Sequence, residues 1–178
     1  NPIAGTLMLE TLAGLARQNP ELLKDKRFAV ISLPLFKENM SWAALRVGEW
    51  SALLNTSKLV SQMRGQVVMI RTPEELKSAL QDNKFGLILN PYNEWLATGT
   101  IEQHQSYVDA IKDFVIRGGI WWETGGVPFY FSAAYQEYCS YHTLYPAAVA
   151  DFAQFQFASG NVSIFGIQPM LRRPWDRE

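Results

Sequence analysis

Apolar residues along the chain follow two alternating patterns. Short continuous runs, each the length of a strand buried on both faces, occur at 28–33, 67–70, 85–89 and 120–122. Apolar residues at helical spacing occupy other segments, at 3–18, 41–60, 73–82 and 101–117. Strands that alternate with helices in this way predict an α/β domain with a largely parallel sheet and right-handed crossovers.

Capping residues and apolar stripes define the expected helices more closely. Three helices have a polar residue at the expected N-terminal cap: Ser41, Thr72 and Thr100. Glu75 and Gln103 follow two of these residues at capping-box spacing. Gly118 is the expected end of the last helix. The predicted buried face of the first helix consists of Ile3, Leu7, Met8, Leu12, Leu15 and Ala16.

The last third of the chain has a different pattern. Residues 127–150 are rich in Tyr, Ala and Ser and predict a long loop with a helical piece. Phe155 and Phe157 alternate with glutamines, and the run 162–167 follows a turn, which predicts a C-terminal antiparallel hairpin. We therefore expect one three-layer α/β domain over 1–178, with a mostly parallel sheet. The start at Asn1 rather than Met fits a processed protein or a domain excised from a longer one.

Composition narrows the function classes. A net charge of −1 gives no basic footprint for nucleic acid or an anionic membrane surface. No apolar run reaches the roughly 20 residues that a membrane-spanning helix needs, so no membrane insertion is expected. The single cysteine excludes an intrachain disulfide and a multi-cysteine metal site. The localisation stays open, with a lean towards an extracytoplasmic one. Sequons begin at Asn39, Asn55 and Asn161, but they often arise by chance and matter only in a eukaryotic secretory context.

The carboxyl ends of parallel strands are the usual ligand-binding edge of an open α/β sheet. The segment after the third predicted strand is the most polar and aromatic one expected there, and its candidate ligand-binding residues are Asn90, Tyr92, Asn93, Glu94 and Trp95. Its amides and carboxylate can bind hydroxyl groups while Tyr92 or Trp95 stacks on an apolar ring face. The same residues equally fit a packed turn in which Asn90 bonds local backbone.

Glu123 and Thr124 end the fourth predicted strand and are candidates for the same site. A carboxylate at a strand end can act as a base or a ligand anchor. It can equally accept hydrogen bonds from the amides of Gly125 and Gly126. Pairing Glu123 with Glu94 as acid and base gives a hydrolase alternative, which requires that the two carboxyl groups lie about 5–10 Å apart in an open cleft.

Other chemistries fit the sequence poorly. Cys139 and His142 lie between tyrosines, unlike a nucleophile elbow with its small flanking residues, so a structural thiol is favoured. His104 and His142 lack metal-ligand spacing, and we expect no metal site. The glycine pairs match no phosphate-binding motif, and no cofactor is expected.

Three consecutive segments carry a family resemblance: the strand 85–90, the helix 107–114 and the Val-Ile-Arg-Gly-Gly-Ile-Trp-Trp run at 115–122. This order resembles noncatalytic members of the class I glutamine amidotransferase-like superfamily, among them trehalose-utilisation-type proteins and the middle domains of some β-galactosidases. The resemblance covers about 28–126 and implies a flavodoxin-like scaffold within a larger carbohydrate-related protein. Active members have a cysteine in a glycine-flanked elbow, which this chain lacks, so no glutaminase residue is carried over.

The sequence therefore predicts a noncatalytic ligand-binding or architectural module, and it leaves open whether the chain is an enzyme. The expected partner is a saccharide or small polar ligand, a neighbouring domain or a second copy of the chain. One alternative is the hydrolase with Glu123 and Glu94. The other is a protein–protein interaction module that uses the aromatic segment 130–145.

Overall fold

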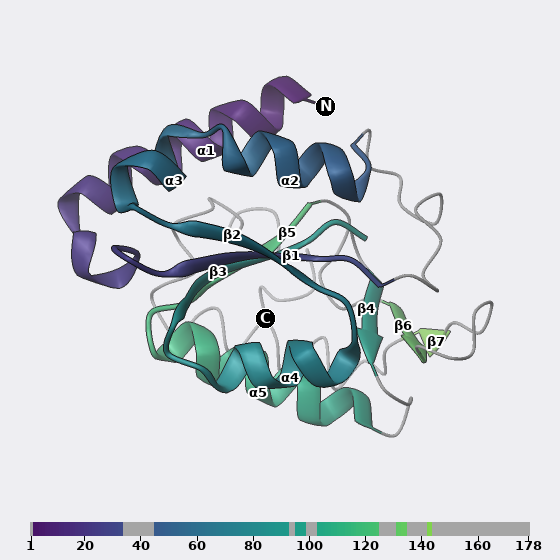
Figure 1. The fold of residues 1–178 in the computed structure, drawn as a ribbon. Helices are drawn as coiled ribbons and strands as arrows, with labels where there is room; N and C mark the ends of the chain where they lie inside the picture. The colour runs from purple at the N-terminus through teal and green to yellow at the C-terminus, as the bar shows by residue number, and fades with distance from the viewer. Residues whose placement is uncertain are drawn as a thin grey trace, which may run out of the picture.

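A four-stranded parallel sheet forms the centre of the protein. The computed structural model describes residues 2–33, 45–92, 95–98, 103–124, 131–134 and 142–143. The sheet consists of β1 (Arg27–Ile31), β2 (Gln66–Ile70), β3 (Phe85–Asn90) and β5 (Ile120–Glu123) in the order β2-β1-β3-β5 (Figure 1). Every neighbouring pair in it is parallel, which confirms the predicted α/β class.

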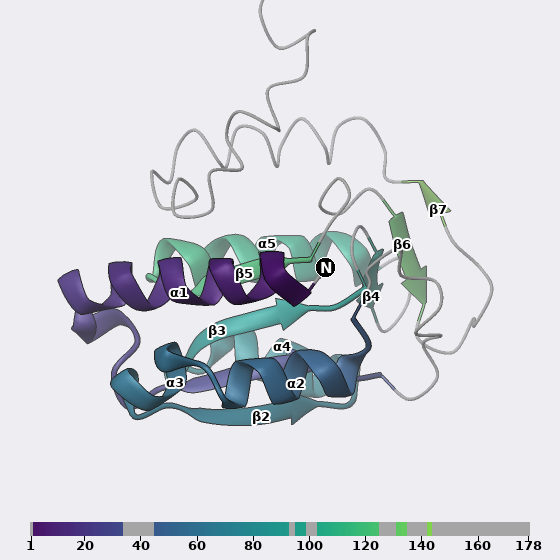
Figure 2. The same cartoon turned by 90° about the horizontal axis from the view of Figure 1, so that it is seen from above.

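Helices cover both faces of this sheet. One face carries α1 (Pro2–Gln18), α2 (Val47–Asn55) and α3 (Lys58–Met63), and the other carries α4 (Pro73–Gln81) and α5 (His104–Ile116) (Figures 1 and 2). A short 3-10 helix, η1 (Pro20–Leu22), connects α1 to β1. Helices α2 and α3, between β1 and β2, therefore lie on one face, and α4 and α5, which follow β2, lie on the other. The sheet thus extends from β1 towards both edges, as in a doubly wound fold.

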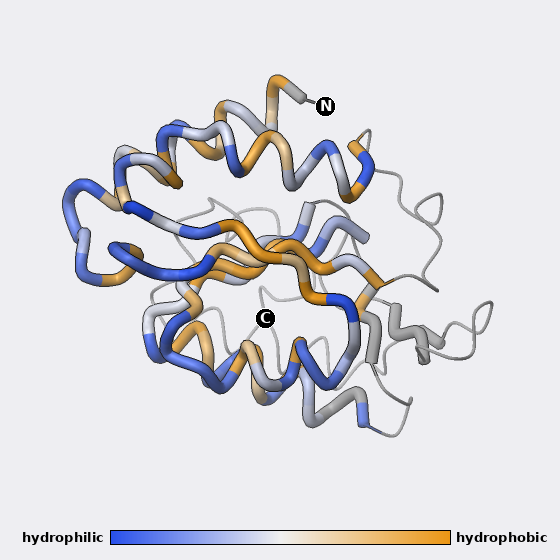
Figure 3. The backbone as a smooth tube through the Cα atoms, viewed as in Figure 1, coloured by the Kyte–Doolittle hydropathy of each residue, from blue (hydrophilic) through white to orange (hydrophobic). Residues whose placement is uncertain are grey.

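The core lies between the sheet and these helices. Strands β1 and β3 are buried on both faces, as their continuous apolar runs predict, and they form the orange centre of Figure 3. Helix α5 presents the predicted apolar stripe to the core: Tyr107, Val108, Ile111, Phe114 and Val115. Each fully buried large apolar side chain contributes roughly 1.5–3 kcal/mol, so this layer supplies much of the driving force for folding.

Helix α4 begins as its local sequence predicts. Thr72 is the N-cap, its hydroxyl accepts from the Glu75 amide at 3.1 Å, and Pro73 occupies the first helical turn. The Glu75 carboxylate reaches one residue further back than a capping box requires, because it accepts from the Arg71 amide at 2.6 Å. The helix ends at Gln81, two residues before the expected stop at Asn83.

The predicted start and continuity of the second helix are wrong. Helix α2 begins at Val47 with Arg46 as N-cap, where Glu49 accepts from the Arg46 amide at 2.7 Å, whereas the expected cap Ser41 lies outside the described residues. Helix α2 then ends at Asn55, with Thr56 as its C-cap. Ser57 caps the separate helix α3, because its hydroxyl accepts from the Val60 amide. A second capping residue inside the apolar pattern thus divides one expected helix into two.

The start of α5 and the buried face of α1 also differ from expectation. Helix α5 begins at His104, and Gln103 makes no side-chain cap hydrogen bond. In α1, the predicted buried face includes Ile3 and Leu7, yet Ile3 is 77% exposed and Leu7 67% exposed. Leu9, which is not part of the predicted face, is buried. Gly5 lies so close to Trp50 of α2 that an added Cβ would be 2.9 Å from its ring, so packing against α2 rotates the buried face.

A second, smaller sheet lies beyond the carboxyl ends of the main strands (Figures 1 and 2). In it β4 (Trp95–Thr98) pairs in parallel with β6 (Phe131–Ala134), which pairs antiparallel with β7 (His142–Thr143). The hairpin expected at 154–167 lies outside the described residues and has no support. Within the described ranges, no helix is both long and apolar enough to cross a bilayer.

Candidate functional site

The last residues of β3 and β5 face each other across the sheet. Asn90 and Glu123 are register partners, and both side chains are buried. The Asn90 Nδ2 atom donates to Glu123 Oε2 at 2.7 Å. Two polar side chains at the ends of otherwise apolar strands are thus joined directly to one another, at the edge where open α/β sheets bind ligands.

Trp121 donates to the other carboxyl oxygen of Glu123. Its Nε1 atom lies 2.8 Å from Glu123 Oε1. Residues two apart on a strand project from the same face, so β5 itself sets this contact. Burial raises the pKa of the Glu123 carboxyl well above its ordinary value, and the hydrogen bonds from Trp121 and Asn90, which favour the charged form, lower it by less.

Asn90 also organises the backbone that follows both strands. Its Oδ1 atom accepts from the Tyr92 amide at 3.2 Å, which closes an Asx turn after β3. Its main-chain oxygen accepts from the Thr124 amide at 3.3 Å and from Thr124 Oγ1 at 3.1 Å. Asn90, Glu123 and Thr124 thus form one hydrogen-bonded group, called the Asn90–Glu123 cluster below, which includes Trp121 and Tyr92.

Tyr92 connects the cluster to the first strand. Its hydroxyl accepts from the Leu33 amide at 2.8 Å, and only 2% of the residue is exposed. Leu33 follows β1. In the sheet, β2 lies on one side of β1 and β3 on the other, so the strand order reverses its direction between β1 and β3. The Tyr92–Leu33 hydrogen bond therefore spans the topological switch point, where ligands of doubly wound sheets bind.

The opposite side of β5 is aromatic. Trp122 contacts Trp50 of α2 edge to face, with ring centroids 5.3 Å apart at an interplanar angle of 72°. Trp50 Nε1 is buried and has no hydrogen-bond partner among the described residues. This contact fixes Trp122 on the α2 face and, by alternation along the strand, Trp121 and Glu123 on the face covered by α4 and α5.

The predicted site residues are divided between the cluster and other positions. Asn90, Tyr92, Glu123 and Thr124 come together, whereas Asn93 and Glu94 lie outside the described residues, as do Gly125 and Gly126. Trp95 belongs to strand β4 rather than to a loop. Tyr92 is too buried to stack on a ligand in this structure. The sequence reading missed Trp121 as a partner of Glu123, although the two-residue spacing on one strand is the signal that connects them.

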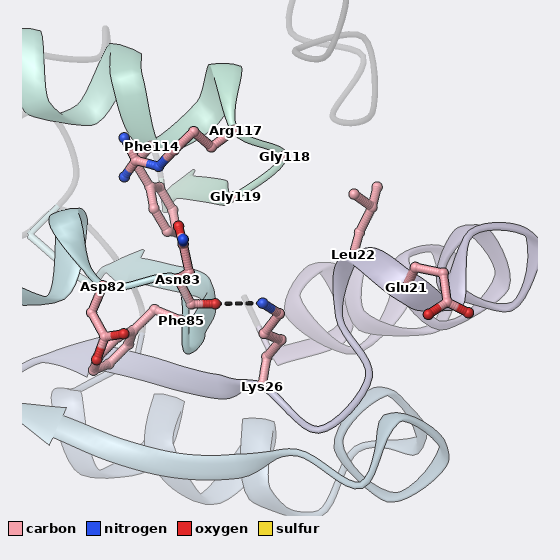
Figure 4. Close-up of a pocket in the computed structure, with 10 residues that line it drawn as sticks. All are labelled: Glu21, Leu22, Lys26, Asp82, Asn83, Phe85, Phe114, Arg117, Gly118 and Gly119. Atoms are coloured by element: carbon pink, nitrogen blue, oxygen red, sulfur yellow. Dashed lines mark hydrogen bonds between the residues drawn. The ribbon is translucent and has the colours of Figure 1, made fainter.

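A cavity of about 410 Å³ lies at the opposite, amino edge of the sheet (Figure 4). Lys26 reaches across it and donates to the main-chain oxygen of Asn83. Phe114 and Gly119 belong to its wall. Its mixed charges and its distance from the strand ends that bear the Asn90–Glu123 cluster make it a weaker candidate for a ligand site.

Neither a search for metal ligands nor comparison with known proteins assigns a role to the Asn90–Glu123 cluster. Among the residues that the structure describes, no group of three His, Cys, Asp or Glu side chains could hold a metal ion. Comparisons of the chain with family models, curated proteins and solved structures find no match. The Asn90–Glu123 cluster is therefore interpreted from its own geometry.

Proposed function

We propose that the chain is a noncatalytic ligand-binding module of flavodoxin-like topology. The observation that carries this proposal is that both carboxyl oxygens of Glu123 already accept hydrogen bonds within the chain. The donors are Asn90 at 2.7 Å and Trp121 at 2.8 Å. A carboxyl group held on both oxygens by buried side chains is a fixed part of the scaffold. It holds the ends of β3 and β5 in place and leaves the adjoining segments to contact the ligand.

The strand order supports the flavodoxin-like part of the proposal. The order β2-β1-β3-β5 corresponds to the first four strands of the 2-1-3-4-5 order of flavodoxin-like domains. This topology is also the one implied by the resemblance to noncatalytic amidotransferase-like proteins. We extend the proposal accordingly to a module of a larger carbohydrate-related protein.

The proposed ligand is a saccharide or another small polar molecule at the carboxyl edge. Thr124 is the half-buried member of the Asn90–Glu123 cluster, and β4 begins at Trp95, three residues after Tyr92. In this proposal Trp95, with Asn93 and Glu94 before it, contacts the ligand, and Thr124 supplies a hydroxyl at the rim. Aromatic faces and hydroxyl or amide donors are the usual elements of a saccharide site.

A ligand-stabilisation screen tests this proposal. Sugars, nucleotides and divalent metals are added to the full chain, and thermal unfolding is followed by fluorescence. A bound saccharide at a hundred times its Kd adds about 2.7 kcal/mol, which raises Tm by roughly 5–11 °C for a chain of this size. The shift should be lost in Trp95→Ala and kept in Lys26→Ala, at the opposite edge. No shift with any sugar would remove the ligand-binding part of the proposal and leave an architectural module.

One observation favours a second candidate, a glycosidase-like hydrolase. The raised pKa of Glu123 is the property that a general acid needs near neutral pH. In this alternative Glu123 is the acid and Glu94 the second carboxylate. Hydrolysis of aryl glycosides by the full chain, abolished in Glu123→Gln and in Glu94→Gln, would establish the enzyme and overturn the noncatalytic proposal.

A further inference from the structure

Strand β2 is an edge of the main sheet, with its outer side directed away from β1. The Gln66 amide donates to the Lys26 oxygen at 3.1 Å, and the Ile70 oxygen accepts from the Ser32 amide at 2.7 Å. Backbone groups of successive residues in a strand point to opposite sides, so 66, 68 and 70 face β1. The N–H and C=O groups of Val67 and Met69 therefore point outward.

Among the residues that the structure describes, the outer edge of β2 has no partner. In the described part of the chain β2 pairs with β1 alone, and no further hydrogen bond reaches Val67 or Met69. At the two ends of the strand the next outward amides are already engaged, since Gly65 donates to the Val60 oxygen at 2.9 Å and Arg71 to Glu75 at 2.6 Å. The free edge thus consists of two residues, Val67 and Met69.

Apart from its short length, this edge lacks the features that normally prevent strand pairing. Proteins protect edge strands with prolines, charged side chains or bulges. The strand reads Gln-Val-Val-Met-Ile, and it pairs with β1 in continuous register. Val67, Val68 and Met69 are each half-buried, so apolar surface accompanies the free backbone groups. An apolar, unprotected edge of this kind is a template for another strand.

We infer that β2 pairs antiparallel with β2 of a second copy of the chain, about a two-fold axis through Val68. In an antiparallel pair, two opposed residues with outward backbone groups exchange both of their N–H···O bonds. An axis through Val68 sets Val67 of each copy opposite Met69 of the other. Every free backbone group of the edge is then satisfied, and two four-stranded sheets become one continuous sheet.

The other symmetric registers satisfy fewer groups. An axis through Val67 would oppose Met69 to Gly65, and an axis through Met69 would oppose Val67 to Arg71. Gly65 and Arg71 have already committed their amides within the chain. The occupied amides at both ends of β2 therefore select the Val68-centred register, in which the same edge of a second copy supplies a partner for each free N–H and C=O group.

The groove beside β2 suits this register. A cavity of about 450 Å³ lies between the strand and α4, lined among others by Val68, Ile70, Glu74 and Glu75. The two-fold axis places Gln66 of the second copy opposite Ile70. Residues 66, 68 and 70 project from the same face of the sheet, so Gln66 lies on the face that bears the groove. Its side-chain amide can there donate to the carboxylates of Glu74 or Glu75, on the α4 side of the groove.

Removal of one outward N–H tests the association. Val67→Pro deletes an amide that makes no hydrogen bond within the described part of the chain, and edge strands tolerate proline at such a position. Val67→Ala removes the same side chain but keeps the amide. By sedimentation velocity over a wide dilution series, the full chain and V67A should form concentration-dependent dimers, and V67P should remain monomeric with an unchanged far-UV circular dichroism spectrum. If V67P misfolds, Val68→Lys, which places a charge on the axis, should likewise give a folded monomer.

Single cysteines test the register. With Cys139→Ser as background, Val68→Cys places two cysteines opposite each other at a non-hydrogen-bonded position, with Cα atoms about 4.5 Å apart. Val67→Cys gives the matched control, because residue 67 of the two copies would be diagonal neighbours, about 7–8 Å apart and too distant for a disulfide. Oxidation should crosslink V68C to covalent dimer and leave V67C monomeric.

Three results would overturn the inference. The first is a full chain that stays monomeric at every concentration. The second is a V67P variant that dimerises as well as V67A, since the dimer then uses another surface. The third is equal crosslinking of V67C and V68C, or none in either, from dimeric protein. None of these measurements depends on a ligand at the carboxyl edge, so they are independent of the proposed function.

Discussion

Asn90 and Glu123 are opposed in register at the carboxyl ends of two neighbouring parallel strands, where the Asn90 amide donates to the Glu123 carboxyl group at 2.7 Å. Each residue is the polar end of an otherwise apolar strand. The Asn90 side chain also accepts from the Tyr92 amide at 3.2 Å, so one amide group connects β5 to the turn after β3. Both halves of this side chain therefore contribute to the stability of the edge.

Replacement of Asn90 tests that double role. Asn90→Ala leaves the Tyr92 amide and one Glu123 oxygen buried without this partner, which should lower the free energy of unfolding by about 2–4 kcal/mol. Asn83→Ala is the matched control: Asn83 is exposed, and its replacement should change stability by less than about 0.5 kcal/mol. Urea unfolding of both variants measures the difference. Equal effects would mean that the Asn90 side chain contributes no more than a surface amide.

Glu123 should make the protein less stable as the pH rises. Its pKa is raised in the folded protein, so above the ordinary pKa of glutamate the unfolded chain releases a proton that the folded chain retains. The contribution of Glu123 is fully present below that ordinary pKa, and it is lost as the pH rises through the raised value. Urea unfolding of the wild type between pH 4 and pH 8 should show this decline.

Glu123→Gln supplies the control for the pH effect. The variant cannot ionise, so the part of the pH dependence that comes from residue 123 should disappear. Gln has one acceptor and one donor group facing the two donors from Asn90 and Trp121, so the variant should also lose about 1–3 kcal/mol of stability at low pH. Parallel stability–pH curves for wild type and variant would contradict the assignment of this titration to Glu123.

The Tyr92 hydroxyl should protect the Leu33 amide from exchange. Tyr92→Phe leaves this amide without its acceptor in a buried position, at a cost of about 1–3 kcal/mol. Hydrogen exchange at Leu33 should accelerate strongly in the variant. The neighbouring Ser32 amide donates to the Ile70 oxygen at 2.7 Å and serves as internal control, since its protection should fall only by the change in global stability. Equal acceleration at both amides would show that the hydroxyl has no local role at the switch point.

Sequence patterns determine the strands of this fold better than its helix starts. The continuous apolar runs locate the four central strands to within about two residues, because a strand covered on both faces tolerates few polar positions. Thr72 is predicted correctly as a cap because its interactions are local. Ser41 has equally suitable chemistry, yet α2 begins at Val47, so local signals do not determine which of several capping residues starts the helix. The exposed Ile3 shows the same limit for α1, whose buried face depends on α2.

The part of the candidate site that depends on the order and direction of the strands could be predicted from the sequence. Parallel strands end at one edge, so the sequence suffices to suggest that Asn90 and Glu123 lie near one another. The contact of Tyr92 with Leu33 joins residues 59 positions apart, and no local pattern specifies such a pair. The second sheet was missed because β4 and β6 have only four residues each and β7 only two, and because residues 127–150, which contain β6 and β7, predict a loop with a helical piece.

Two glycines should respond in opposite directions to alanine. At Gly119 an added Cβ would lie 2.4 Å from the Phe114 ring, in the tight connection between α5 and β5, so Gly119→Ala should destabilise the protein by about 1–3 kcal/mol. At Gly48, in the first turn of α2, no described residue lies within 4 Å of the added Cβ, and Gly48→Ala should stabilise the protein by about 0.5–1 kcal/mol through the lower entropy of the unfolded chain. Thermal and urea unfolding of both variants measure these shifts. A stabilised G119A would mean that Phe114 yields its position freely, and the close packing of α5 against the start of β5 would then not constrain the sheet.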